Sequence, residues 1–260
     1  MTGVGDIARA VWAECVSTWR RPDRIWKIGE AQSWRRLLRF QGIRLKAGRR
    51  WDTSGSPRLS ARRLASYEDY LSLQRSKLEY LDLSEHEQAF RRVLRERVGD
   101  LGFVRPGVTV LCLGARLGSE VAAFIDCGTF AVGVDLNPGT ANPYVVTGDF
   151  HALQFADRSV DVVYSNSVDH AFDLKRLLAE VRRVLKPEGH LVLELDPGTH
   201  ERAEPADDLW QTLAWNATDD LVNAVRTEGF FVVGRRKYDY PRGGTQVVLR
   251  PESTALDRNG

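Results

Sequence analysis

The chain has 260 residues, of which 43% are hydrophobic and 28% are charged, and its formal net charge is +2. This length allows one large α/β domain with an extension, and the composition predicts a soluble globular protein. Apolar runs all fall well short of the roughly 20 residues of a membrane-spanning helix, and the N-terminus lacks the pattern of a secretion signal.

The first quarter of the chain differs in composition from the rest. Residues 1–65 contain 15 Lys and Arg against 5 Asp and Glu, so this segment carries a net charge of +10 and the remainder −8. Five of the seven tryptophans also lie there, namely Trp12, Trp19, Trp26, Trp34 and Trp51. We therefore expect a basic, Trp-rich extension at 1–86, a main domain at 87–251 and a tail at 252–260.

Most of the extension has the periodicity of helices. Residues 7–20 and 25–43 place apolar side chains at helical spacing, and residues 47–60 form a loop rich in Gly, Ser and Pro. Two further helices are predicted within residues 61–100. The first of these helices is a candidate lid over the ligand cleft. Tyr67, Tyr70 and Gln74 lie on it at helical spacing and are candidate contacts to the ligand.

Strands and helices alternate from Val108 onward. The predicted strands are 108–113, 130–135, 144–146, 160–165, 189–196, 230–238 and 244–250. The predicted helices are 119–126, 172–186 and 218–228. The alternation predicts a parallel sheet with helices on both faces. The last two strands are joined by a turn too short for a helix, so they are expected to form an antiparallel hairpin.

The first strand, turn, helix and second strand of this region have the pattern of a nucleotide-binding unit. The apolar run from Val108 breaks at the turn Gly114-Ala115-Arg116-Leu117-Gly118, and the second strand ends on Asp135, 21 residues after Gly114. Glycines allow the backbone to turn tightly and to approach a ligand. A carboxylate about 20 residues later accepts hydrogen bonds from a ribose diol.

The details of the turn favour S-adenosylmethionine over NAD. A dinucleotide turn has the pattern G-x-G-x-x-G, but Arg116 stands at the middle glycine and the third glycine is absent. Glu120, at the start of the helix, would oppose a pyrophosphate and suits a cofactor that carries an ammonium and a sulfonium. A dehydrogenase is thus compatible with the fold but not with the full glycine pattern.

Four segments together resemble the class I S-adenosylmethionine-dependent methyltransferases, in the group called methyltransferase type 11. They are VLCLGARLGSEVAAF, VGVDLNP, GDFHALQFADRSVDVVYSNSVDHAFD and EVRRVLKPEGHLVLELDP. The resemblance covers residues 87–251. It implies a Rossmann-like, mostly parallel seven-stranded sheet with helices on both faces and a C-terminal antiparallel hairpin, preceded here by a helical extension. It also implies methyl transfer from S-adenosylmethionine, with S-adenosylhomocysteine as product.

The resemblance also implies roles for individual residues. Gly114, Arg116, Gly118 and Glu120 would surround the methionine end of the cofactor, and Asp135 would hold the ribose. The other implied contacts are Leu136 and Asn137 beside the adenine, Asp149 at its amino group, Phe150 on its ring, and Ser165 and Asn166 below the methyl group. Cys112 and Arg116 depart from the family's acid-x-Gly-x-Gly-x-Gly turn. Arg116 would occupy part of the cofactor pocket, pair with the cofactor carboxylate, or form an ion pair with Glu120.

Asp169 and His170 follow the fourth strand and are the candidate catalytic residues. His170 is the candidate general base for an alcohol acceptor, because a neutral imidazole accepts protons near pH 7; the alternative is a packing role. Asp169 would orient His170, contact the cofactor or cap the next helix. Asp169, Asp196 and His200 include the ligand types of a divalent metal, but a metal is the less favoured interpretation and no metal ligand is assigned.

The acceptor class follows less directly from the residues. We expect O-methylation of a small molecule or saccharide in the cytoplasm, where the three cysteines, which lack zinc spacing, would stay reduced. The basic extension motivates RNA or another nucleic acid as an alternative acceptor, although no RNA-binding module is recognisable. The altered glycine turn motivates a second alternative, a non-catalytic cofactor-binding scaffold. The oligomeric state does not follow from the sequence.

Overall fold

The computed structural model describes residues 51–77, 84–202, 210–241 and 243–252, without the side chains of residues 84–87. The helices predicted at 7–20 and 25–43, and all but the first residue of the tail, lie outside this part. The elements below belong to one compact unit that begins at Arg49. None of the helices described there is long and apolar enough to cross a membrane.

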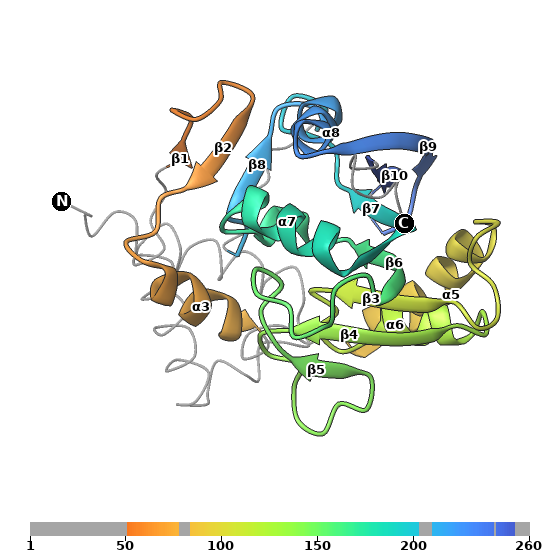
Figure 1. Cartoon of the computed structure of the whole chain (residues 1–260). Helices are drawn as coiled ribbons and strands as arrows, with labels where there is room; N and C mark the ends of the chain where they lie inside the picture. The colour runs from red at the N-terminus through yellow and green to blue at the C-terminus, as the bar shows by residue number, and fades with distance from the viewer. Residues whose placement is uncertain (1–50, 78–83, 203–209, 242, 253–260) are drawn as a thin grey trace, which may run out of the picture. The chain divides into compact units, whose positions relative to one another are not determined.

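The unit is built on a seven-stranded sheet with the order β5-β4-β3-β6-β7-β10-β9 (Figure 1). Its strands are β3 (Thr109–Leu113), β4 (Phe130–Asp135), β5 (Val145–Thr147), β6 (Val160–Ser165), β7 (Leu185–Leu195), β9 (Phe230–Tyr238) and β10 (Gly244–Pro251). The strands from β5 to β7 in this order are parallel, whereas β10 is antiparallel to both β7 and β9. The predicted mostly parallel sheet with a C-terminal hairpin is confirmed.

The alternation of side chains along the central strands separates two hydrophobic cores. Val110 and Cys112 pack in one core, and the intervening Leu111 and Leu113 pack in the other, because successive residues of a strand face opposite sides of the sheet. The first core includes α5 (Ser84–Gly99) and α6 (Ser119–Ile125); the second includes α7 (Leu174–Val184) and α8 (Thr218–Thr227). Helices therefore cover both faces of the sheet, as expected.

One boundary in this region differs from the prediction. The strand expected from residue 189 begins at Leu185, directly after α7. Leu185 pairs with Val160 of β6, and the register then shifts before Val162 pairs with His190. The Leu-Lys-Pro-Glu-Gly segment is thus an irregular start of β7 rather than a separate turn.

A second, three-stranded sheet was not expected. It has the order β1-β2-β8 and consists of β1 (Trp51–Asp52), β2 (Leu59–Arg62) and β8 (Leu213–Trp215). Residues 47–60, predicted as a loop, therefore contain strand residues that pair with a segment about 150 residues later. After this hairpin comes α3 (Tyr67–Arg75), which is capped by Ser66, whose side chain accepts a hydrogen bond from the Asp69 N–H.

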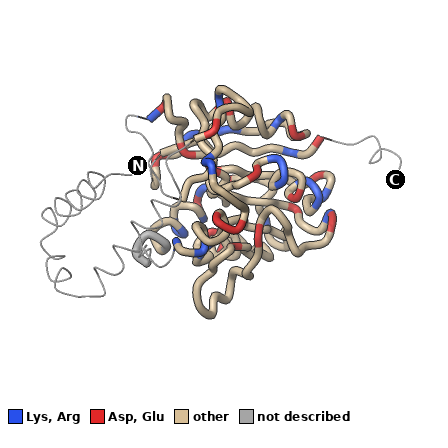
Figure 2. The backbone as a smooth tube through the Cα atoms, turned by 90° about the vertical axis from the view of Figure 1, so that its left-hand side faces the viewer, with Lys and Arg blue, Asp and Glu red and all other residues tan. Residues whose placement is uncertain are grey.

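Acidic and basic residues are interspersed along the described backbone (Figure 2). The strongly basic composition of residues 1–65 falls mostly on residues outside the described part. The hypothesis that a basic arm binds nucleic acid therefore stays a prediction from composition.

Candidate functional site

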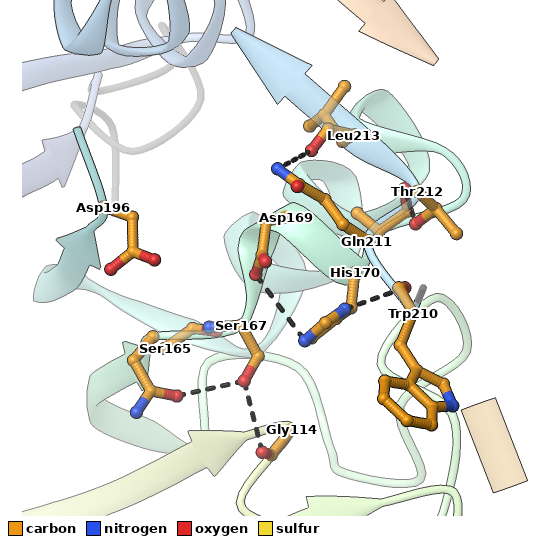
Figure 3. A network of polar contacts seen from close by, with 12 residues as sticks. Gly114, Ser165, Ser167, Asp169, His170, Asp196, Trp210, Gln211, Thr212 and Leu213 are labelled. Carbon is orange, nitrogen blue, oxygen red and sulfur yellow. Dashed lines mark hydrogen bonds and ion pairs between the residues drawn. The ribbon is translucent and has the colours of Figure 1, made fainter. Parts of the chain in front are cut away.

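The turn after β3 is shaped by glycines that no other residue replaces easily. Gly114 and Gly118 have φ angles of 67° and 90°, in the left-handed region that glycine enters without strain. A Cβ at Gly114 would lie 2.6 Å from the Cβ of Ser167, which follows β6. The Ser167 hydroxyl also donates to the Gly114 carbonyl at 3.4 Å (Figure 3). The turn is thus held against the end of β6.

This packing predicts a large difference between two glycine-to-alanine variants. Gly114→Ala adds a methyl group with no room and a strained φ angle, and we expect it to lower the free energy of unfolding by roughly 2 kcal/mol or more. Gly102→Ala is the matched control, because nothing lies within 4 Å of the position that its added methyl group would take. Urea unfolding measures both; equal effects would contradict the packing argument.

Asp135, at the end of β4, is fixed beside this turn. Its Oδ2 accepts a hydrogen bond from the Arg116 N–H at 3.0 Å, and its Oδ1 accepts one from the Asn137 N–H at 2.8 Å. Each carboxylate oxygen has two lone pairs, so both retain an acceptor position. The carboxylate is therefore oriented by the backbone and remains able to accept two ligand hydroxyl groups.

A cavity opens at the carboxyl ends of β3, β4 and β6. Its empty space is about 470 Å³, including the part open to solvent. It is lined by Tyr70, Gln74, Lys77, Gly114, Arg116, Asp135, Leu136, Asn137, Phe150, Ser167 and His170. In the sheet, β4 lies beside β3 on one edge and β6 lies beside it on the other, so the strand order reverses at β3. Such reversals of strand order are where open α/β sheets bind ligands.

Helix α3 closes one side of the cavity and is held at both ends. Near its start, the Tyr67 hydroxyl donates to Asp149, which follows β5. At its last residue, the carbonyl of Arg75 accepts from the Asn137 side chain at 2.6 Å. Tyr70 is fully buried and is among the residues that line the cavity. The helix thus forms part of the cavity wall.

Asp149 lies behind the cavity wall rather than among the lining residues. Its Oδ1 accepts from both the N–H and the Nδ1 of His151, at 2.8 and 2.9 Å. The backbone N–H groups of Phe172 and Asp173 donate to Nε2 of the same imidazole, so the proton of neutral His151 lies on Nδ1. Burial alone would raise the pKa of Asp149, but the hydrogen bonds from His151 and Tyr67 outweigh it and lower the pKa to about 2.

This lowered pKa predicts a pH-dependent contribution to stability. An unfolded Asp titrates near 3.9, so the stabilisation is complete above that pH and is lost as the pH falls toward 2. Tyr67→Phe removes one of the donors and should cost about 1 kcal/mol of unfolding free energy at pH 6. The cost should shrink below pH 4, as measured by urea unfolding. A cost that stays constant down to pH 2.5, or an equal cost for the control Tyr144→Phe, would contradict this account.

Three other candidate residues lie beside the turn and outside the cavity lining. Asn166 donates to Oε1 of the buried Glu120 at 3.1 Å. The Ser165 hydroxyl donates to the Leu113 carbonyl at 3.2 Å and accepts from the Ser167 N–H at 3.1 Å. These contacts join the ends of β3 and β6 to the first turn of α6 and so position Ser167 at the cavity.

His170 lines the cavity, and its partners define its protonation state. Its Nδ1 lies 2.9 Å from the carbonyl of Trp210 (Figure 3). Its Nε2 lies 2.7 Å from the Lys77 ammonium. A carbonyl only accepts and an ammonium only donates, so beside a charged Lys77 the proton lies on Nδ1 and Nε2 accepts. Asp169 lies 3.8 Å from Nε2. Lys77, which is nearly buried, was missed by the sequence reasoning, because only the fold brings it to His170.

The described residues contain no group of three His, Cys, Asp or Glu side chains arranged to hold a metal ion. Asp196, one of the three residues considered as metal ligands, pairs with Arg202 at 3.4 Å. Its carboxylate is therefore stabilised by a cation from the same loop region.

Comparison with known proteins gives a common result. Residues 111–193 match the family model described as a methyltransferase domain. The chain is 34% identical over 120 residues to 24-methylenesterol C-methyltransferase 2 of Oryza sativa, covering 40% of this chain and 33% of that protein. It is 35% identical over 99 residues to malonyl-[acyl-carrier protein] O-methyltransferase 1 of Coxiella burnetii, covering 35% of each. The chain thus spans about a third of the length of these curated relatives.

A solved structure has the same fold over most of its length. It is the 1,6-didemethyltoxoflavin-N1-methyltransferase of Burkholderia thailandensis, with bound 1,6-didemethyltoxoflavin and S-adenosylhomocysteine. The TM-score is 0.57 at 17% identity, covering 75% of this chain and 95% of that one. At this identity the likeness shows the fold alone.

Proposed function

We propose that this chain, which contains a class I S-adenosylmethionine-dependent methyltransferase domain, transfers a methyl group from S-adenosylmethionine to an oxygen atom of a small molecule or saccharide. The observation that carries the proposal is the Asp135 carboxylate, oriented by two backbone N–H groups at the cavity. The named relatives methylate carbon or oxygen, so the choice of oxygen rests on His170.

The cavity suits the adenosine part of the cofactor. Asp135 would accept hydrogen bonds from both ribose hydroxyls, and Leu136 and Phe150 would pack on the adenine beside Asn137. Asp149, which does not line the cavity, would act indirectly, by holding α3 beside the adenine through its hydrogen bond with Tyr67. Gly114 and Gly118 would let the backbone approach the methionine part. Glu120, Ser165 and Asn166 would act from beside the turn.

When bound, S-adenosylmethionine supplies a methyl group on a positively charged sulfur, so the protein mainly has to align the acceptor and receive its proton. His170 would meet the second requirement, because Trp210 would hold its proton on Nδ1 and Nε2, now bonded to Lys77, would be the atom that accepts a proton. Lys77 would release Nε2 when an acceptor hydroxyl donates to it. Asp169, 3.8 Å away, would stabilise the imidazolium that forms.

Calorimetric titration with S-adenosylmethionine, S-adenosylhomocysteine and NAD tests the cofactor. Micromolar binding of S-adenosylmethionine and S-adenosylhomocysteine, with no binding of NAD, would support the proposal. Failure to bind either would overturn it, and preferential binding of NAD would favour a dehydrogenase.

Transfer of a radiolabelled methyl group tests the acceptor. The full chain would be incubated with pooled alcohols, phenols and sugars, with amines, and with RNA, each with magnesium or with a chelator. Label on an oxygen acceptor would support the proposal, and label only on amines or RNA would overturn it. Cofactor binding without transfer to any pool would favour the scaffold interpretation.

A further inference from the structure

Arg116 has a backbone conformation that glycine would adopt at lower cost. Its φ angle is 43°, one of three positive values among the non-glycine residues described. The conformation is fixed from both sides, because its N–H donates to Asp135 and its carbonyl accepts from the Asn142 side chain at 3.2 Å. Strain of this kind persists where the surroundings enforce it and often marks a functional position.

Arg116 is a positively charged residue at the cavity. The residue lines the cavity and is partly buried. Within the described part of the chain, no carboxylate forms an ion pair with its guanidinium. Glu120, the partner considered from the sequence, accepts instead from Asn166 and Ser119. A guanidinium has five donors and matches a carboxylate with two parallel hydrogen bonds.

We propose that Arg116 binds the carboxylate of the methionine part of the cofactor, an inference that rests on the proposed function. Asp135 would fix the ribose, and the Arg116 N–H is bonded to that same carboxylate. The ribose therefore lies next to the residue whose side chain carries the charge. The carboxylate is the one anionic group of S-adenosylmethionine, so Arg116 makes the cavity selective for ligands that carry it.

Two ligands separate this role from a general effect on the cavity. S-adenosylhomocysteine and S-adenosyl-3-thiopropylamine differ only in the carboxylate. Calorimetric titration would measure both with the wild-type chain, Arg116→Gln and Arg116→Lys. The control is Arg158→Gln, because Arg158 also has a positive φ angle of 51° but is exposed and outside the cavity lining.

We expect the wild-type chain to bind S-adenosylhomocysteine with at least about tenfold higher affinity than the amine, because the amine lacks the charge-assisted pair with Arg116. Arg116→Gln should remove this preference while leaving the affinity for the amine nearly unchanged, and Arg116→Lys should restore part of it. Equal affinity of the wild-type chain for the two ligands would overturn the inference, even if a variant fails to fold. An equal loss for both ligands in Arg116→Gln would also overturn it. If neither ligand binds the wild-type chain, both the proposed function and this inference fail.

Discussion

Asp135→Asn will lower the affinity for S-adenosylhomocysteine by about 10- to 150-fold or more, which corresponds to the 1.5–3 kcal/mol of one hydrogen bond to a charged group. Both Asp135 oxygens accept backbone N–H bonds in the structure. An asparagine has one oxygen, so its NH₂ group would face either the Arg116 or the Asn137 donor. The substitution therefore disturbs the turn as well as the ribose contact.

The control for this prediction is another paired aspartate outside the cavity. Asp126 directly follows α6 and accepts two hydrogen bonds from Arg91. Asp126→Asn should affect stability modestly and leave the affinity for S-adenosylhomocysteine unchanged. Calorimetry of both variants, with circular dichroism to verify folding, decides the matter. Wild-type affinity in a folded Asp135→Asn protein would remove Asp135 from the ribose site.

The central sheet could be predicted closely because its signals are local. Apolar runs marked each strand, glycines marked the turn after β3, and Asp135 ended β4. Apart from the start of β7, the seven strands and α6, α7 and α8 lie within two residues of the predicted positions. These elements are stabilised by two cores with regular alternation, so the pattern of the sequence and the packing agree.

The parts that escaped prediction depend on contacts between distant residues. The strands β1, β2 and β8 are two to four residues long, too short for a period to be read, and they exist through pairing across the chain. The approach of Lys77 to His170 and of Tyr67 to Asp149 spans 93 and 82 residues. Local propensity carries no information on such pairs. A Tyr and a Gln at helical spacing predicted the lid, but not the groups that hold it.

His170→Gln should lower the turnover number by about 10²- to 10⁴-fold, the usual contribution of a general base, with little change in cofactor affinity. The measurement uses the acceptor identified by the radiolabel screen and titrates S-adenosylhomocysteine separately. His200→Gln is the control, because His200 lies in the loop after β7 and does not line the cavity. Unchanged turnover in His170→Gln would remove His170 as the base.

Lys77→Met tests whether His170 or Lys77, which share a hydrogen bond at His170 Nε2, is the general base. If His170 receives the proton, Lys77 only occupies the lone pair before the acceptor binds, and its loss should leave more than about a tenth of the turnover. The reverse pattern, an inactive Lys77→Met and an active His170→Gln, would make the lysine the base. Because Lys77 Nζ and His170 Nε2 lie 2.7 Å apart, a proton taken from the acceptor could end on either nitrogen. Only the pair of variants, compared on the same acceptor, assigns the chemical step.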